Sequence, residues 1–197
     1  MRSVRCTAPR LLRFTAAVLL KAGKYYAAIV ITEKFTYSMY NVFSEDFEGS
    51  FSVCPSGWQV LAGEVSRTTD HAAGGSASVM IRDASAKSSA SLISPSVRLT
   101  AGVYYRITVD VMNLSGNGSV FVNIYGKNGQ QTDSVSTTVT ETGKWTTAEL
   151  TVCLPETADS IRILLYSGMA NKGETCYDNV SVTRSDGDSE QQIHPFE

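Results

Sequence analysis

Residues 104–112 read YYRITVDVM, and apolar and polar side chains alternate along this stretch. Alternation with a period of two is typical of a β-strand with one face in a protein core and the other in solvent. The inward set begins at Tyr105 and continues with Ile107, Val109 and Val111. The opposite side carries Tyr104, Arg106, Thr108, Asp110 and Met112. The stretch therefore predicts a half-buried strand.

Further stretches of the same kind follow at spacings of about 10 to 15 residues, divided by turns rich in glycine, asparagine and proline. They are residues 76–81, 119–125, 134–140, 144–154, 160–166 and 176–183. No segment after Asn41 has the pattern of a long amphipathic helix. The sequence predicts an all-β fold, a jelly-roll β-sandwich of two antiparallel sheets over residues 44–184.

The composition fits one folded domain with extra chain at its ends. The chain has 197 residues and 43% of them are hydrophobic, which excludes a disordered protein. The net charge is −2 and the part after the N-terminal extension has no basic stripe, so nucleic acid is not expected as a partner. No run approaches the roughly 20 apolar residues of a membrane-spanning helix. Residues 185–197 are predicted to form an acidic polar tail.

The N-terminal extension, residues 1–43, differs from the rest. Its first 32 residues hold six basic residues and no acid, as secretory or transit segments do, although Lys21 and Lys24 interrupt the apolar pattern. AVLLKAGKYY at 17–26 and SVRLTAGVYY at 96–105 agree at six of ten positions, by chance or because a tandem module is truncated. In either case we expect no independent domain. The extension adds a strand to the sandwich or is loosely held.

Catalysis is not expected. No pair among Cys6, Cys54, Cys153 and Cys176 has the C-x-x-C spacing, and their disulfide pairing stays open. Only one of the two histidines, His71, lies outside the tail. The sequence contains no G-x-S-x-G or H-E-x-x-H motif, and its acids form no obvious pair on one face. We therefore expect a protein that is not an enzyme.

Six short motifs, in this order, resemble a known family. They are Asp46–Glu48 (DFE), Gly57–Trp58, Gly74–Val79 (GGSASV), Leu99–Tyr105 (LTAGVYY), Thr142–Trp145 (TGKW) and Tyr177–Val182 (YDNVSV). In order and spacing they resemble the CenC-type carbohydrate-binding modules of the galactose-binding-like jelly-roll superfamily. The resemblance implies a secreted or cell-surface module that binds a polysaccharide or glycan. It also implies that Trp58 and Trp145 mostly pack in the core.

The resemblance implies a structural calcium ion that ties the first strand to the last. The matching residues are Glu48 and Asp178, with Asp46 and Ser76 as further contributors. Oxygen ligands from distant parts of a sandwich suit calcium, which takes about six to eight oxygens. The alternative is that these two carboxylates cap backbone N–H groups. Some family members have a cysteine before the aspartate, so Cys54–Cys176, Cys153–Cys176 or free thiols are all open.

Strand parity predicts a face for the sugar. Its outward residues include Arg106, Asp110, Asn123, Tyr125, Arg162 and Tyr166. Aromatic rings can stack on sugar rings while the polar groups bond hydroxyls, but alternation also produces an ordinary solvated sheet face. No row of exposed aromatics is evident, so a soluble chain or chain end is expected rather than a crystalline surface.

A second hypothesis is a structural or adhesive module of an extracellular assembly, without a sugar site, that contacts neighbouring domains or associates with itself. Asp46–Glu48, Gly57–Trp58, Asp70–His71, Leu92–Pro95 and Trp145 are also similar to the MAM domain of adhesion receptors. The chain lacks a cysteine just before Asp46, which puts the first disulfide of that domain in doubt.

Overall fold

The computed structural model describes residues 16–22, 25–31, 40–168 and 171–185. The chain divides into two compact units, residues 1–39 and residues 40–197. The first 15 residues, with Cys6, and the tail from 186 onward lie outside the described residues, as do the predictions made for them. Within the described part, no helix is long and apolar enough to cross a membrane.

In the N-terminal unit the structure describes two strands. Strands β1 (Ala16–Ala22) and β2 (Tyr25–Ile31) pair antiparallel as a two-stranded sheet. The similar segment at 96–105 forms no hairpin, since β8 (Val97–Arg98) joins one sheet of the sandwich and β9 (Tyr104–Ser115) the other. The similarity in sequence therefore does not extend to the structure.

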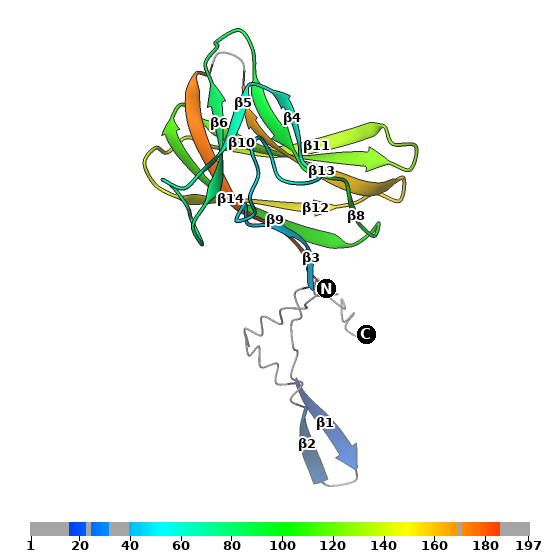
Figure 1. Ribbon diagram of the computed structural model, residues 1–197. Helices are drawn as coiled ribbons and strands as arrows, with labels where there is room; N and C mark the ends of the chain where they lie inside the picture. The colour runs from blue at the N-terminus through cyan, green and yellow to red at the C-terminus, as the bar shows by residue number, and fades with distance from the viewer. Residues whose placement is uncertain (1–15, 23–24, 32–39, 169–170, 186–197) are drawn as a thin grey trace. The chain divides into compact units, whose positions relative to one another are not determined.

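The second unit is a sandwich of two six-stranded sheets, shown in Figure 1. The sheet that we call the β10 sheet has the order β11 (Gln131–Val139), β10 (Gly118–Gly126), β13 (Ala158–Ser167), β7 (Ala90–Ile93) and β4 (Gln59–Ala62), with β8 paired to β13. The β9 sheet has the order β12 (Thr146–Cys153), β9, β14 (Gly173–Ser185), β6 (Ser78–Asp83) and β5 (Glu64–Thr68), with β3 (Tyr40–Glu45) paired to β14. All these strand pairs are antiparallel, so the predicted fold class is confirmed.

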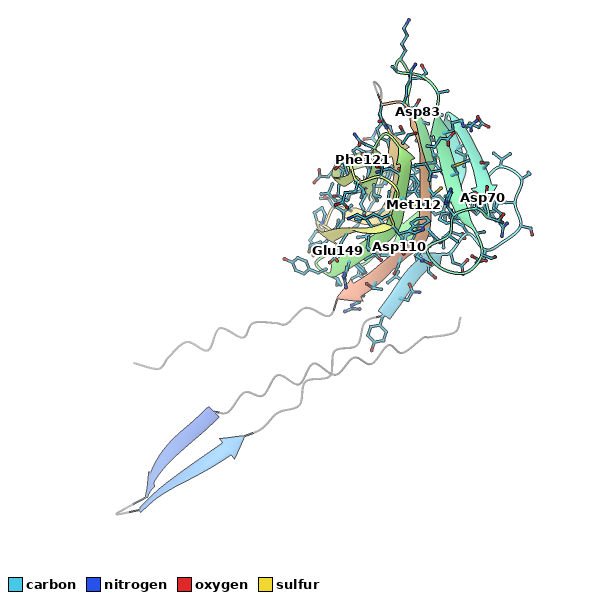
Figure 2. The ribbon with its side chains drawn as sticks, turned by 90° about the vertical axis from the view of Figure 1, so that its left-hand side faces the viewer. Asp70, Asp83, Asp110, Met112, Phe121 and Glu149 are labelled. Carbon is cyan, nitrogen blue, oxygen red and sulfur yellow. The ribbon has the colours of Figure 1, made fainter. Side chains whose placement is uncertain are left out.

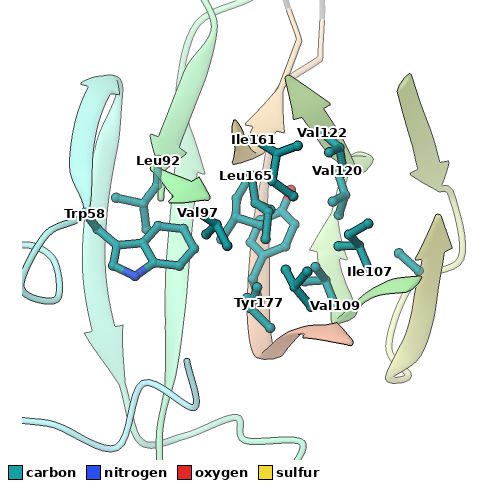
Figure 3. Close-up of a cluster of buried hydrophobic side chains, with 14 of the residues drawn as sticks. Trp58, Leu92, Val97, Ile107, Val109, Val120, Val122, Ile161, Leu165 and Tyr177 are labelled. Atoms are coloured by element: carbon teal, nitrogen blue, oxygen red, sulfur yellow. The ribbon is translucent and has the colours of Figure 1, made fainter. Parts of the chain in front are cut away.

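The core fills the space between the two sheets (Figure 3). The predicted inward set of β9 is confirmed, because Tyr105, Ile107, Val109 and Val111 are each at most 3% exposed. They meet the inward side chains of the β10 sheet, which include Val120, Val122, Ile161, Ile163 and Leu165. Burial of this apolar surface is the main stabilising contribution to a sandwich.

Trp58, Trp145 and Met112 differ in how deeply they are buried. Trp58 is buried as expected and packs on Phe47, with ring centroids 5.4 Å apart, whereas Trp145 is only half-buried. Met112, predicted to point outward, is only 7% exposed. Its neighbours in the register of the sheet are Cys176 and then Met80, so this part of the outer side is filled by sulfur-containing side chains.

Candidate functional site

The six residues predicted to bind sugar lie on opposite sides of the molecule. Asn123 and Tyr125 belong to β10, and Arg162 and Tyr166 belong to β13, so these four share the outer side of the β10 sheet. Arg106 and Asp110 belong to β9, in the other sheet. Parity tells which side of its own strand a residue occupies, but not to which sheet the strand belongs. The prediction of one shared face is therefore corrected to four residues on one face and two on the other.

The outer side of the β10 sheet, called the β10 face below, carries an aromatic pair at its centre. The register sets Ser119 opposite Tyr166 and Phe121 opposite Leu164. The rings of Phe121 and Tyr166 meet edge to face, with centroids 5.3 Å apart and an interplanar angle of 82°. Such a pair holds both rings in a fixed orientation. Phe121 was not among the predicted residues, although it has the same parity as Asn123 and Tyr125.

Polar groups border this aromatic pair. Asn123 faces Arg162 across the strands, and its Oδ1 accepts a hydrogen bond of 2.9 Å from Ser134 Oγ on β11. Arg162 Nε donates to the Ser94 carbonyl at 2.8 Å. Tyr125, Arg162 and Tyr166 are half-buried, while Asn123 is 7% exposed and acts mainly within the sheet. The β10 face thus combines oriented rings with donors and acceptors for hydroxyl groups.

On the outer side of the β9 sheet, called the β9 face, the polar groups are already used within the protein. Asp110 and Glu149 of this sheet are labelled in Figure 2. Arg106 Nη2 donates to Glu149 Oε2 at 2.5 Å. Asp110 accepts from Thr147 Oγ1 at 2.6 Å and from Asn179 Nδ2 at 2.9 Å. These bonds link β9 to its neighbours β12 and β14, and they leave fewer groups for a ligand.

The two carboxylates predicted to hold calcium bind the backbone of one loop, residues 73–77. Glu48 Oε1 accepts from the N–H groups of Ser76 and Ala77 at 2.8 and 3.0 Å, and Glu48 Oε2 accepts from Ser76 Oγ at 2.7 Å. Asp178 Oδ2 accepts from the N–H groups of Ala73 and Gly74 at 2.8 and 3.1 Å. Its Oδ1 accepts from the Asn179 N–H at 2.7 Å.

The carboxylates predicted to bind calcium are engaged with hydrogen-bond donors in this structure. Each of the four carboxylate oxygens of Glu48 and Asp178 already accepts a hydrogen bond, and Asp46 Oδ1 accepts one from the Glu48 N–H. In the described part of the chain no three His, Cys, Asp or Glu residues cluster as metal ligands would. The geometry matches the alternative, in which the carboxylates cap backbone N–H groups. The calcium site stays a prediction.

The two carboxylates respond differently to their surroundings. Hydrogen bonds from the Ser76 side chain and then from the backbone N–H groups of Ser76 and Ala77 lower the pKa of Glu48. Burial raises the pKa of Asp178, and its backbone hydrogen bonds offset part of that effect. Asp178 is fully buried, so it depends on these N–H groups to balance the loss of water.

Strained backbone adjoins both carboxylates. Phe47 and Asn179 are the non-glycine residues of the described chain with positive φ, at 54° and 47°. Each directly adjoins one of the two carboxylates, Glu48 or Asp178. Gly75 has a φ of 65°, and a Cβ there would lie 2.2 Å from Glu48 Oε1. Only glycine lets the loop approach this carboxylate so closely.

The cysteines of the sandwich are free thiols. Cys54 is half-buried, Cys153 exposed and Cys176 buried, and none of them forms a disulfide. The proposed bridges Cys54–Cys176 and Cys153–Cys176 are therefore absent. Burial raises the pKa of the Cys176 thiol to about 11, which makes it unreactive near neutral pH.

Two hollows in the surface lie apart from the residues predicted to bind sugar. One, of about 270 Å³, lies between β11 and β12 and is lined largely by threonines together with Glu141 and Glu149. The other, of about 310 Å³, is lined by Arg82, Asp83 and Lys172 among others. Neither includes any of the six residues predicted to bind sugar.

Comparison with known proteins identifies the family of the sandwich. A family model described as "Carbohydrate binding domain" (CBM_4_9) matches residues 40–178, from the first strand of the sandwich into its last. No curated protein sequence matches the chain significantly. These comparisons do not support the similarity to the MAM domain.

Three solved structures share the fold. The enzymatically active domain of bacteriophage CBA120 tailspike protein 4 superposes with a TM-score of 0.57 and 16% identity over 66% of this chain and 19% of that chain. The CBM22-1–GH10 modules of Clostridium thermocellum xylanase 10B, complexed with xylohexaose, give 0.57 and 19% over 74% and 29%. The C-terminal family 22 carbohydrate-binding module of Clostridium thermocellum Xyn10B gives 0.55 and 17% over 74% and 94%. The chain thus spans under a third of the first two chains and nearly all of the single module.

Proposed function

The chain belongs to the carbohydrate-binding domain family, as a non-catalytic module, and we propose that it binds a polysaccharide through its β10 face. The observation that carries the proposal is the edge-to-face pair of Phe121 and Tyr166, with Arg162, Asn123 and Tyr125 beside it. Aromatic rings offer apolar surface to the C–H groups of a sugar ring, and the polar groups fix its orientation by hydrogen bonds.

The register indicates how a sugar chain would lie. Leu164 and Phe121 lie opposite each other in one row across the sheet, which the largely buried Ile93 continues. Arg162 lies in the next row, opposite the largely buried Asn123. An apolar row beside a polar row suits an extended chain whose sugar rings pack on one row while their hydroxyls reach the other. No crystalline surface is needed, because a row of this length contacts only a few sugar units.

The ligand that we propose is a soluble β-linked chain such as xylan. One similar structure holds xylohexaose beside a GH10 catalytic module, although at that identity the likeness itself shows only the fold. We further propose that the module is secreted or held at the cell surface, where such polysaccharides occur, and that it accompanies a catalytic domain.

The experiment is isothermal titration of xylohexaose into the wild type and two variants. Tyr166→Ala and Phe121→Ala should each lower the affinity about tenfold, since each removes a stacking surface and releases the other ring. Tyr104→Ala is the matched control, because Tyr104 is a tyrosine on the β9 face that is 55% exposed. Equal losses in the control and in Tyr166→Ala would overturn the choice of face. Absence of binding to any glycan, together with self-association, would overturn the function.

A further inference from the structure

The charged side chains on the β10 face are both arginines. Arg162 lies on β13. Arg98 on β8 pairs with Ser160, which is two residues before Arg162 on β13 and on the same side of that strand. Diagonal neighbours of this kind have Cα atoms about 7–8 Å apart, so one carboxylate group can interact with both. Asp133 and Asp159 border this end of the face. Their Oδ1 atoms accept local hydrogen bonds from the Ser134 N–H at 2.8 Å and from Ser160 Oγ at 3.0 Å.

The arginines of the other sheet differ in one respect. Arg106 pairs with Glu149, and Arg82 pairs with Glu174 at 2.6 Å, so each positive charge has a carboxylate on a neighbouring strand. Neither Arg98 nor Arg162 takes part in an ion pair within the described residues. The β10 face therefore carries two arginines without a directly paired carboxylate in the described part of the chain, although Asp133 and Asp159 border this end of the face.

Arg162 is also held in place. Its Nε donates to the carbonyl of Ser94, a residue with no exposed surface. The Ser94 hydroxyl is fixed in turn, because it accepts from the Ile163 N–H at 2.8 Å and donates to the Pro95 carbonyl at 2.9 Å. A guanidinium anchored through Nε keeps its terminal N–H groups for a ligand. Their planar arrangement matches the two oxygens of a carboxylate.

We infer that the β10 face prefers an acidic polysaccharide, with the carboxylate of a uronic acid unit bound by Arg162 and attracted by Arg98. The inference rests on the proposed function of the same face. A bidentate, charge-assisted contact of this kind should strengthen binding about tenfold over the neutral polymer.

The test compares two forms of one polymer. The wild type is titrated with glucuronoxylan and with the same glucuronoxylan after reduction of its carboxyl groups to alcohols. We expect about tenfold tighter binding of the acidic form. This preference should largely disappear in 0.5 M NaCl, where the screening length is about 4 Å. Equal binding of both forms would overturn the inference and leave the proposed function standing. Binding of neither form would overturn the proposed function itself.

Variants assign the preference to these residues. Arg162→Ala should abolish the preference for the acidic form, and Arg162→Lys should keep only part of it, because lysine keeps the charge and loses the planar arrangement. Arg98→Ala changes an exposed residue, so it removes one positive charge without disturbing the fold. Because Arg98 attracts the carboxylate, this variant should reduce the preference a few-fold. Arg106→Ala is the matched control and should leave the preference unchanged. A preference that survives both Arg162→Ala and Arg98→Ala would contradict the assignment.

Discussion

The two outer faces of the sandwich have similar patterns in sequence and different states in the structure. On the β9 face, Arg106 is paired with Glu149, and Asp110 accepts hydrogen bonds from its neighbours. On the β10 face, Phe121 and Tyr166 contact each other, and Arg162 has no carboxylate partner within the described chain. Polar outward residues thus indicate a binding face only when their cross-strand neighbours leave them available.

The β9 sheet also carries the polar contacts that hold the loop at residues 73–77. Glu48 and Asp178 reach this loop from the first and the last part of the sandwich. We therefore regard the β9 sheet as the structural half of the module and the β10 sheet as its binding half. If that division holds, substitutions in the β9 sheet should change stability and leave glycan binding intact.

Asp178→Ala should lower the free energy of unfolding by about 2–4 kcal/mol, because three N–H groups lose their charged acceptor in a buried position. Asp178→Asn should cost nearly as much, since the amide brings N–H donors toward other N–H donors. Urea unfolding measures both. The folded fraction should still bind glycan like the wild type, and a selective loss of binding in a stable Asp178→Asn protein would contradict the division.

Glu48→Gln should lower stability less than Asp178→Ala and should make it less dependent on pH. The pKa of Glu48 is lowered in the folded state, so its contribution is present above the usual glutamate value of about 4.3 and is lost as the pH falls through its lowered pKa. The raised pKa of Asp178 acts in the opposite direction, because protonation there favours the folded state. Between pH 6 and pH 3 the melting temperature of Glu48→Gln should fall less with decreasing pH than that of the wild type. An equal fall of the melting temperature in both proteins would refute the contribution of the Glu48 carboxylate to stability.

The pair of Arg106 and Glu149 should contribute less than about 1 kcal/mol, because both side chains are substantially exposed to solvent. A double-mutant cycle with Arg106→Ala and Glu149→Ala measures this coupling. Neither variant should change glycan affinity. A tenfold loss of affinity in Arg106→Ala would show that the β9 face takes part in binding.

Calcium should have the smallest effect. Because the carboxylate oxygens of Glu48 and Asp178 already accept hydrogen bonds, addition of calcium or EDTA should barely change the melting temperature. A bound ion at 100 times its dissociation constant would add about 2.7 kcal/mol. A rise of several degrees that disappears in Glu48→Ala would therefore support the metal site predicted from the family resemblance.

The sequence predicts the long strands well and the short ones poorly. Each of the seven alternating stretches overlaps an observed strand, because strands such as β9, β10 and β13 have enough residues to display a period of two. Strands such as β4, β7 and β8 have four, four and two residues, too few for the pattern to show. Their place in the sheets follows from packing with distant strands.

The candidate site follows from the sequence only in part. Parity correctly puts Asn123, Tyr125, Arg162 and Tyr166 on an outer side. It cannot separate them from Arg106, because sheet membership depends on topology. It also cannot show that the family-matched Glu48 bonds backbone N–H groups, since those donors lie 28 and 29 residues away in the chain.

The most direct test of the division is an NMR titration of the labelled protein with xylohexaose. We expect the largest chemical-shift changes on β10 and β13, around Phe121 and Tyr166, and almost none on β9 and β12. Shifts concentrated on β9 and β12 around Arg106, with β10 and β13 unchanged, would contradict the division.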